Sequence, residues 1–372
     1  MRRRLVRATL GLLAAASLFV LTLELLLAVW PTLLPPRLGN HAYSKYGVFP
    51  GGIHFYEPQS ALHFMRSNFE TRAYFNGYTW THRTDSLGFR NPRQLTDRSL
   101  LLLGDSLIYG HGVEERDSVA QLLRTEFSRP AYSMASQGDC LLQSYVLLRL
   151  NLEALDPETV VLFVFLNDFA DAALYRTAAE MQAPPEIDWD YDAMRERLAD
   201  READVGLSPK RLLLGLRSVR LLRGAWRDLT PISLIANAEA AGEPPAQPGF
   251  IDAVLDPGTF SRTSHYYRKL LDDLARRLDR QDVDLYVVHL DLSPQFSGRG
   301  DQARQRLERF LRRVTGELAI AFATTEETFA DCTDCFLPAD GHLSPAGHRR
   351  LAGFVDAMLS AGNAGSTDVS AD

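Results

Sequence analysis

The sequence is poor in cysteine and in charged residues. Its 372 residues include 3 cysteines, and 23% of them are charged against 46% that are hydrophobic. This balance is typical of a globular protein and excludes a largely disordered one. The net charge of −7 argues against a general nucleic-acid binder, so we expect no nucleic-acid partner. Lysine is also scarce, and we attribute the preference for arginine to genomic base composition. No internal repeat or cluster of metal ligands stands out.

The few cysteines restrict the chemistry further. Cys332 and Cys335 form the motif CTDC. A zinc site would need a second ligand pair, a thioredoxin-like motif would need a strand–helix junction, and neither is evident. We therefore expect no metal ion and predict a short-loop disulfide between Cys332 and Cys335, formed in an oxidising compartment. Cys140 is left over and is expected to be a buried apolar residue.

One long hydrophobic run is present, near the N-terminus. Residues 8–30 are mostly apolar and follow a basic tail, residues 1–7. A bilayer span takes about 20 residues, whereas the apolar core of a cleaved signal peptide usually has about 7–15. We therefore predict a retained, single-pass signal anchor over 8–30 in the inner (cytoplasmic) membrane. By the positive-inside rule the tail stays cytoplasmic, and the chain after Pro31 is extracytoplasmic, in the periplasm.

A serine stands at a predicted strand end. Residues 101–113 read LLLGDSLIYGHGV, and Ser99–Leu103 is apolar enough for a buried parallel strand. Ser106 follows this strand, and open α/β sheets bind ligands at the carboxyl ends of their strands. Ser106 is thus a candidate nucleophile. A loop serine that makes local turn hydrogen bonds is the alternative.

A histidine that could activate this serine lies in a late loop. Residues 338–348 read PADGHLSPAGH, and Ser344 followed by Pro345 predicts the start of a helix. His342 precedes that helix and follows Asp340 by two positions. A nucleophilic serine needs a base, and a histidine oriented by a carboxylate is the usual one. An ordinary loop aspartate and histidine are the alternative.

Two further strand ends carry hydrogen-bond donors. Gly138 follows a short predicted strand at 131–133, and Asn167 ends the very apolar segment 160–168. The backbone N–H of a glycine turn and a side-chain amide are the donors that an oxyanion hole needs. Taken separately, Gly138 would be a turn residue and Asn167 a helix cap.

In chain order, Ser106, Gly138, Asn167 and His342 resemble the four sequence blocks of the SGNH (GDSL) hydrolase superfamily. The resemblance covers roughly residues 98–360; the serine and LND blocks match closely, and the glycine block more loosely. It implies an α/β fold with a three-layer, flavodoxin-like parallel sheet and helices on both faces. It also implies that Ser106 is the nucleophile, His342 the base, and that no organic cofactor is used. Ser106, Gly138 and Asn167 would form the oxyanion hole.

The position of the acid departs from the family. Many members carry it three residues before the histidine, and here that position is Ala339. Asp340, two residues before His342, resembles the D-x-H arrangement of alginate O-acetylation proteins. We therefore take Asp340 as the acid, with Asp334 and Asp331 as weaker candidates.

The remaining chain is organised around this domain. Residues 38–97 are predicted to be an N-terminal extension of short strands and turns, 98–360 the hydrolase domain and 361–372 a flexible tail. The strand–helix alternation stops over 172–257, which we interpret as a cap-like insertion that shapes substrate access. Within it, 210–227 carries arginines at helical spacing opposite leucines. A membrane-surface helix, an anionic-glycan contact and a cap helix packed on the core are the alternatives.

The domain itself alternates strands and helices, which predicts a parallel sheet covered on both faces. Strands are predicted near 99–103, 131–133, 160–166, 284–290 and 318–322, and helices near 118–128, 141–153, 262–279, 301–315 and 344–360.

These features predict a membrane-anchored serine esterase that hydrolyses acyl esters, with O-acetylated extracytoplasmic carbohydrate as the expected substrate. Two other functions stay open. The same residues in a water-poor site would transfer an acetyl group to a surface or secreted polysaccharide, which would require a donor or polysaccharide-modification partners. A non-catalytic carbohydrate-binding protein on the same fold is the third possibility.

Overall fold

The structure is a computed structural model of the chain. It describes residues 2–43, 53–57, 62–92, 95, 97, 99–177, 179–187, 193, 213, 216–229, 249–292, 295–338 and 340–366. Ala339, most of the predicted insertion between 188 and 248, and residues 367–372 of the predicted tail lie outside the described residues.

The chain divides into two compact units. Unit 1 comprises Met1–Ile53, Arg72–Trp80 and Leu198–Ala246, and unit 2 comprises His54–Thr71, Thr81–Arg197 and Gln247–Asp372. The segment expected to be one cap-like insertion is therefore divided between the units.

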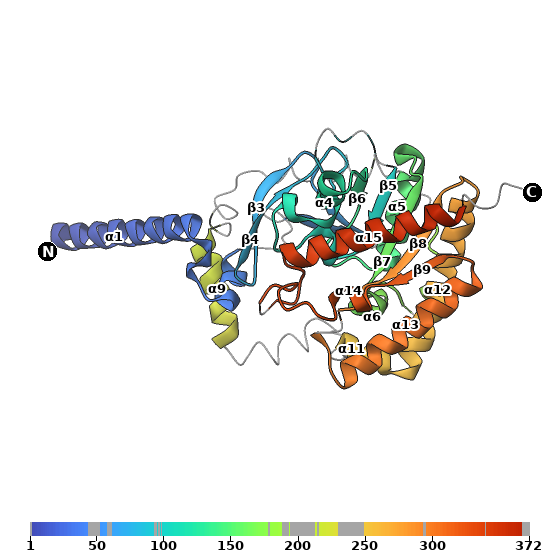
Figure 1. Ribbon diagram of the computed structural model, residues 1–372. Helices are drawn as coiled ribbons and strands as arrows, with labels where there is room; N and C mark the ends of the chain where they lie inside the picture. The colour runs from blue at the N-terminus through green and yellow to red at the C-terminus, as the bar shows by residue number, and fades with distance from the viewer. Residues whose placement is uncertain are drawn as a thin grey trace, which may run out of the picture. The chain divides into compact units, whose positions relative to one another are not determined.

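A five-stranded parallel sheet forms the core of unit 2 (Figure 1). Its strands are β5 (Leu100–Leu103), β6 (Ala131–Ser133), β7 (Thr159–Val164), β8 (Asp284–His289) and β9 (Ala321–Thr324), in the order β6-β5-β7-β8-β9. Numbered along the chain, this is the flavodoxin-like order 2-1-3-4-5. The predicted α/β class and strand order are confirmed.

Helices cover both faces of this sheet. Every residue of β5 and β6 is buried, and because successive side chains point to opposite faces, both faces must be covered. The helices of unit 2 whose bounds the structure describes are α3 (Ser106–Tyr109), α4 (Val119–Glu126), α5 (Leu141–Leu155), α6 (Leu166–Tyr175), α11 (Phe250–Leu255), α12 (Pro257–Asp279), α13 (Arg299–Glu317), α14 (Glu326–Phe329) and α15 (Pro345–Ser366), with short 3-10 turns at Glu115–Asp117 and Glu180–Gln182. α4, α14 and α15 pack as one group, and α5, α6, α12 and α13 as another.

Four predicted boundaries are wrong. α12 begins at Pro257 rather than near 262, because Asp256 caps the helix and Pro257 is its first residue. α15 continues to Ser366, so residues 361–366 are helical and are not part of a flexible tail as predicted.

The other two concern strands. β7 stops at Val164, and the residues after it form α6, because the Asp168 carboxylate accepts the Phe165 N–H at 2.8 Å and caps a helix there. β9 begins at Ala321 rather than near 318, because α13 continues to Glu317 and Ala319 then turns with φ +55°.

Short antiparallel strands are present in the predicted extension. β1 (His54–Glu57) pairs with β2 (Leu62–Met65), and β3 (Glu70–Phe75) pairs with β4 (Tyr78–Arg83). The expectation that this segment contains no helix is wrong at its start, where Pro36–Ala42 forms α2. Proline at the first helical position has a backbone angle suited to a helix start.

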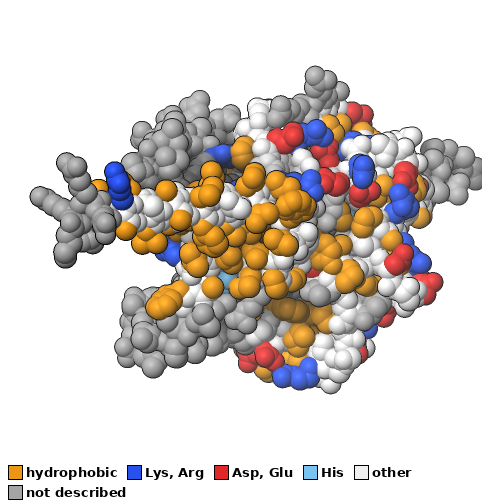
Figure 2. All heavy atoms as spheres, turned by 90° about the vertical axis from the view of Figure 1, so that its left-hand side faces the viewer, with side chains coloured by type: hydrophobic (Ala, Val, Ile, Leu, Met, Phe, Trp, Pro, Cys, Tyr) orange, Lys and Arg blue, Asp and Glu red, His pale blue; other side chains and the backbone are white. Residues whose placement is uncertain are grey.

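Unit 1 contains the long apolar helix. α1 (Arg2–Val29) is followed by the 3-10 turn Pro31–Leu33, by α2 and, much later, by α9 (Arg217–Leu229). Val6–Val29 of α1 is long and apolar enough to cross a membrane, and Figure 2 shows hydrophobic side chains exposed along it. Its C-terminal end is different: Leu27 is fully buried, and its carbonyl accepts the Tyr43 hydroxyl. The end of α1 is therefore part of the folded unit.

A buried arginine holds the turn after α3. Arg90 is 3% exposed, and its guanidinium donates to the carbonyl oxygens of Gly110 and Val113 at 2.7 Å. It also donates to Tyr109 O at 3.2 Å and to Thr81 O at 3.0 Å. Gly110 ends α3 in the left-handed conformation. The last carbonyl groups of a helix have no partner within the helix, and the bonds from Arg90 supply one.

Replacing Arg90 should therefore destabilise unit 2. Arg90→Met leaves four carbonyl groups without this donor, three of them buried, and we expect a loss of about 3 kcal/mol, or roughly 5–10 °C in Tm. The matched control is Arg83→Met, because Arg83 is 42% exposed and pairs with Glu115 at 2.8 Å. That variant should lose less than about 1 kcal/mol. Thermal unfolding of the full chain in detergent measures both, and equal shifts would contradict the role of Arg90.

Candidate active site

Ser106 lies in a tight turn between the central strand and a short helix. It is the first residue of α3, directly after β5 and Gly104-Asp105. The Asp105 carboxylate caps the helix by accepting the Leu107 N–H at 2.9 Å. A Cβ on Gly104 would lie 2.7 Å from Ile108 Cγ1, so the turn requires glycine at this position. The turn presents Ser106 at the carboxyl edge of the sheet.

His342 lies against this serine although the two are 236 positions apart. Its Nε2 is 2.8 Å from Ser106 Oγ, and its Nδ1 is hydrogen-bonded to Asp340 Oδ1. The Asp340 carboxylate is fully buried, while the His342 side chain is 19% exposed. A carboxylate on Nδ1 favours the tautomer in which Nδ1 carries the proton and Nε2 can accept one from the serine. The structure thus brings these three candidates together.

The two-residue spacing of Asp340 and His342 depends on Gly341. Its φ is +83°, in the left-handed region that favours glycine, and this turns both side chains toward each other. The Leu337 N–H closes the turn by donating to His342 O at 2.7 Å. Gln295 Nε2 donates to the Gly341 carbonyl, also at 2.7 Å.

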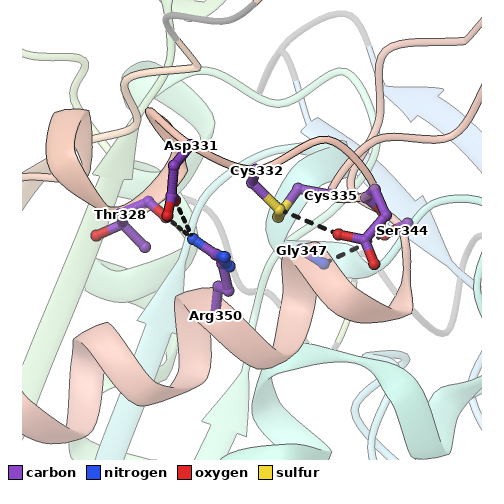
Figure 3. Close-up of a disulfide and its surroundings, with 8 residues drawn as sticks. Thr328, Asp331, Cys332, Cys335, Ser344, Gly347 and Arg350 are labelled. Carbon is purple, nitrogen blue, oxygen red and sulfur yellow. Dashed lines mark hydrogen bonds and ion pairs between the residues drawn. A yellow bond between two sulfur atoms is a disulfide. The ribbon is translucent and has the colours of Figure 1, made fainter.

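The disulfide loop before this turn is held by the start of α15 (Figure 3). Cys332 and Cys335 are joined by a disulfide, and Cys140 is a buried free cysteine. The Ser344 N–H donates to Cys335 O at 2.8 Å, and the Gly347 N–H donates to Ser344 Oγ at 3.2 Å. A Cβ on Gly347 would lie 2.2 Å from Cys335 O, so helix and loop are in close contact.

The two weaker acid candidates lie in other surroundings, and His342 Nδ1 is hydrogen-bonded to Asp340. Asp331 is 80% exposed, and its carboxylate accepts from Arg350 Nη1 at 2.6 Å. This pairing lowers the pKa of Asp331. Asp334 is exposed, with Oδ1 3.3 Å from Cys332 Sγ. Figure 3 shows Asp331 turned toward Arg350 of α15.

Gly138 and Asn167 lie after the two strands that flank β5. Gly138 follows β6 with φ +82°, and its carbonyl accepts the Tyr175 hydroxyl at 3.1 Å. The Ser136 N–H donates to Gly104 O at 3.3 Å, which joins this turn to that of Ser106. Asn167 follows β7, but in the first turn of α6 rather than at the strand end as expected. Because the strands are parallel and adjacent, these residues share one edge of the sheet.

His111 packs on the ring of His342, a contact that the sequence did not reveal. The two ring centroids are 4.1 Å apart and 27° from parallel. Gln137 Nε2 lies 2.5 Å from His111 Nδ1. No spacing along the sequence related His111 to His342.

A second histidine–carboxylate pair borders Gly138. His63 of β2 places Nδ1 3.3 Å from Asp139 Oδ1, and its Cε1 lies 3.9 Å from the position of a Cβ on Gly138. Its ring meets Tyr175 edge-on at 5.7 Å. Burial raises the pKa of Asp139 to about 6, and the hydrogen bond from His63 opposes the shift. His63 lies in the predicted extension, and no local pattern related it to the site.

Further buried carboxyl groups surround the edge of the sheet. Burial, reinforced by the charge of Asp105, raises the pKa of Asp171 to about 6. Burial also raises the pKa of Asp105, and the nearby His342 opposes that shift. Asn167 Nδ2 donates to Asp171 Oδ2 at 3.3 Å.

Among the described residues, three site side chains could together hold a metal ion. One ligand atom each from His111, Asp340 and His342 lies within 4.8 Å of the others. His342 also uses both ring nitrogens in its hydrogen bonds to Asp340 and Ser106. An ion bound through His342 would have to replace one of those bonds.

No family model and no curated protein matches the chain. Among solved structures, TesA is 14% identical, with 70% of this chain and 98% of that chain covered and a TM-score of 0.39. A lipolytic protein of the G-D-S-L family from Desulfitobacterium hafniense DCB-2 is 8% identical, with 70% of this chain and 99% of that chain covered and a TM-score of 0.39. The psychrotrophic esterase EstA from Pseudoalteromonas sp. is 10% identical, with 72% and 100% covered and a TM-score of 0.38. At this level of similarity, function has to be inferred from the side chains themselves.

Two glycines of α15 should respond in opposite directions to alanine. Gly347→Ala forces the helix and the disulfide loop apart, and we expect a loss of about 1–3 kcal/mol. Gly353 is the matched control, because a Cβ there would meet Phe127 Cζ at an ordinary 3.6 Å. Gly353→Ala should gain up to about 1 kcal/mol from helix propensity. Thermal unfolding of both variants tests this, and a shift of Tm in the same direction would refute the close contact.

Proposed function

We propose that this chain is a serine hydrolase of the SGNH type that cleaves acyl esters. The observation that carries the proposal is the series of hydrogen bonds from Ser106 through His342 to the buried Asp340. It lies at the edge of a parallel sheet where such folds bind their ligands. A serine, a histidine and a buried carboxylate in this relation make a nucleophile, its base and the group that orients the base.

The proposed reaction proceeds in two halves. Ser106 Oγ attacks the ester carbonyl while His342 Nε2 accepts its proton, and the resulting tetrahedral intermediate collapses to an acyl-serine. His342 returns the proton to the departing alcohol. A water molecule then attacks the acyl-serine, again giving a proton to His342, and the acid is released as Ser106 recovers its proton. Asp340 keeps His342 in the required tautomer and stabilises the imidazolium.

The negative oxygen of each intermediate needs donors at the same edge. We assign this role to the backbone N–H groups of Ser106 and Gly138 and to the amide of Asn167. At 3.3 Å, the bond from Asn167 to Asp171 is long for a hydrogen bond, so the amide can turn to a substrate oxygen at small cost. The positive φ of Gly138 and the bond from Tyr175 fix the orientation of the glycine turn.

The preferred substrate in this proposal is an O-acetyl ester of extracytoplasmic carbohydrate, with water as acceptor. The His342 side chain is 19% exposed, so solvent reaches the imidazole that must activate water. α1 would anchor the protein in the inner membrane, with the basic tail in the cytoplasm and the chain after Pro31 in the periplasm. The disulfide suits an oxidising compartment. The burial of Leu27 supports a retained helix, because removing α1 would strip contacts from unit 1.

Removing the nucleophile tests the function directly. Ser106→Ala should lower kcat for p-nitrophenyl acetate, and acetate release from acetylated xylan, by about 10⁴-fold or more. Ser118→Ala is the control, because Ser118 caps α4 and its loss should cost about 1 kcal/mol of stability without changing kcat. A fluorophosphonate probe should label Ser106 in the wild type. Wild-type turnover by folded Ser106→Ala would exclude this nucleophile.

The acid is tested by three isosteric variants. Asp340→Asn leaves the shape of the loop but favours the wrong tautomer of His342, so kcat should fall by up to about 10⁴-fold. Asp331→Asn and Asp334→Asn should retain kcat near that of the wild type, since Asp331 pairs with Arg350 and His342 Nδ1 is hydrogen-bonded to Asp340. A large loss in Asp334→Asn with full activity in Asp340→Asn would move the acid into the disulfide loop.

A further inference from the structure

An amphipathic helix is fastened to the end of the apolar helix within unit 1. The Ser218 N–H at the start of α9 donates to Glu24 Oε1 of α1 at 2.6 Å, and Arg217 Nη1 lies 3.9 Å from Glu24 Oε2. Farther along α9, Gly224 lies so close to α2 that a Cβ there would be 2.2 Å from His41 Cγ. α9 is therefore held at both the first and the second turn, and its place relative to α1 is fixed.

This contact sets the depth of α9 in a membrane that α1 spans. Val6–Val29 has 24 residues, which at about 1.5 Å per residue exceeds the roughly 30 Å of a bilayer hydrocarbon core. Glu24, near the C-terminal end of this span, therefore falls at the border of the headgroups. In Figure 1, α9 runs across the end of α1 rather than alongside it. With α1 along the bilayer normal, α9 lies in the plane of the membrane surface.

The side chains on α9 suit that position. Leu222 and Trp226, one helical turn apart, are 67% and 69% exposed, and the neighbouring Arg223 is also exposed. At the end of α1, Trp30 and Leu33 are 56% and 60% exposed. Tryptophan favours the level of the headgroups, and arginine binds their phosphate groups bidentately. A cap helix packed on a core would instead bury its leucines.

We propose that the exposed strip of α9, formed by Leu222, Arg223 and Trp226, lies on the outer surface of the bilayer and binds anionic phospholipid headgroups. Leu222 and Trp226 enter the border between headgroups and acyl chains, and Arg223 meets the phosphates. This inference rests on the proposed membrane anchor and not on the proposed hydrolase activity.

Site-specific fluorescence in vesicles tests the proposal on the full chain. Leu222→Cys is labelled without reductant by the environment-sensitive dye NBD, since Cys140 is buried and Cys332–Cys335 is oxidised. The protein is reconstituted in vesicles of phosphatidylcholine and phosphatidylglycerol that carry nitroxide lipids. Two reference positions use the same label: Leu18→Cys in α1, which is 65% exposed, and Arg276→Cys in α12, whose side chain is 63% exposed.

We expect emission of the Leu222 label to shift to shorter wavelength. Nitroxides near the headgroup should quench it more strongly than nitroxides deep in the acyl chains. The Leu18 label should show the reverse preference, and the Arg276 label neither the shift nor the quenching. If the Leu222 label shows neither the shift nor the quenching while the Leu18 label is quenched by deep nitroxides, the proposal is wrong and the membrane anchor is supported. An unquenched Leu18 label would overturn both.

Varying the charge of the lipid tests the proposed binding to anionic headgroups. The wavelength shift of the Leu222 label should be larger with phosphatidylglycerol than with phosphatidylcholine alone. Arg223→Glu should abolish this difference, since like charges repel, whereas Arg223→Lys should keep it. The same shift in both lipids for the wild type would refute binding to anionic headgroups.

Discussion

The hydrogen bond between Ser106 and His342 is the constraint on which the candidate site depends. It joins two turns 236 positions apart, each of which must be held to a fraction of an ångström for the bond to form. One turn is fixed by helix α3 and the buried Arg90 behind it. The other is fixed by the start of α15, where Gly347 abuts the disulfide loop. Contacts that stabilise unit 2 thus lie beside the candidate site as well as within the sheet.

Charge around this bond is distributed in two opposed ways. The buried Asp340 carboxylate is hydrogen-bonded to His342, which stabilises the imidazolium that a proton transfer creates. Asp139 and Asp171, near the proposed oxyanion donors, are buried, and burial raises the pKa of each to about 6. A carboxyl group with a pKa of about 6 is still mostly ionised at neutral pH, so both groups carry negative charge beside the proposed oxyanion donors and lose it only as the pH falls below about 6.

The features of the fold that depend on a few neighbouring residues could be predicted from the sequence. The buried strand before Ser106, the helix start at Ser344-Pro345 and the disulfide spacing are features of a few neighbouring residues, and the parallel sheet follows from their alternation. α6 was missed because the apolar run of β7 continues into its first turn, and the capping bond of Asp168 leaves no periodic signal. His63 and His111 were missed for another reason. Each meets the site through side-chain packing across the sheet edge, which no spacing along the chain encodes.

The insertion over 172–257 shows the same difference between local pattern and contacts that are distant in sequence. Periodicity identified an arginine-rich amphipathic helix, but several partners suit such a helix, and the sequence does not choose between them. The choice is made by contacts with residues almost two hundred positions earlier, at Glu24 and His41. The end of α1 is buried within unit 1, to which α9 also belongs. A segment inserted into the sequence of the sheet domain thus contributes a helix that holds the end of the apolar helix.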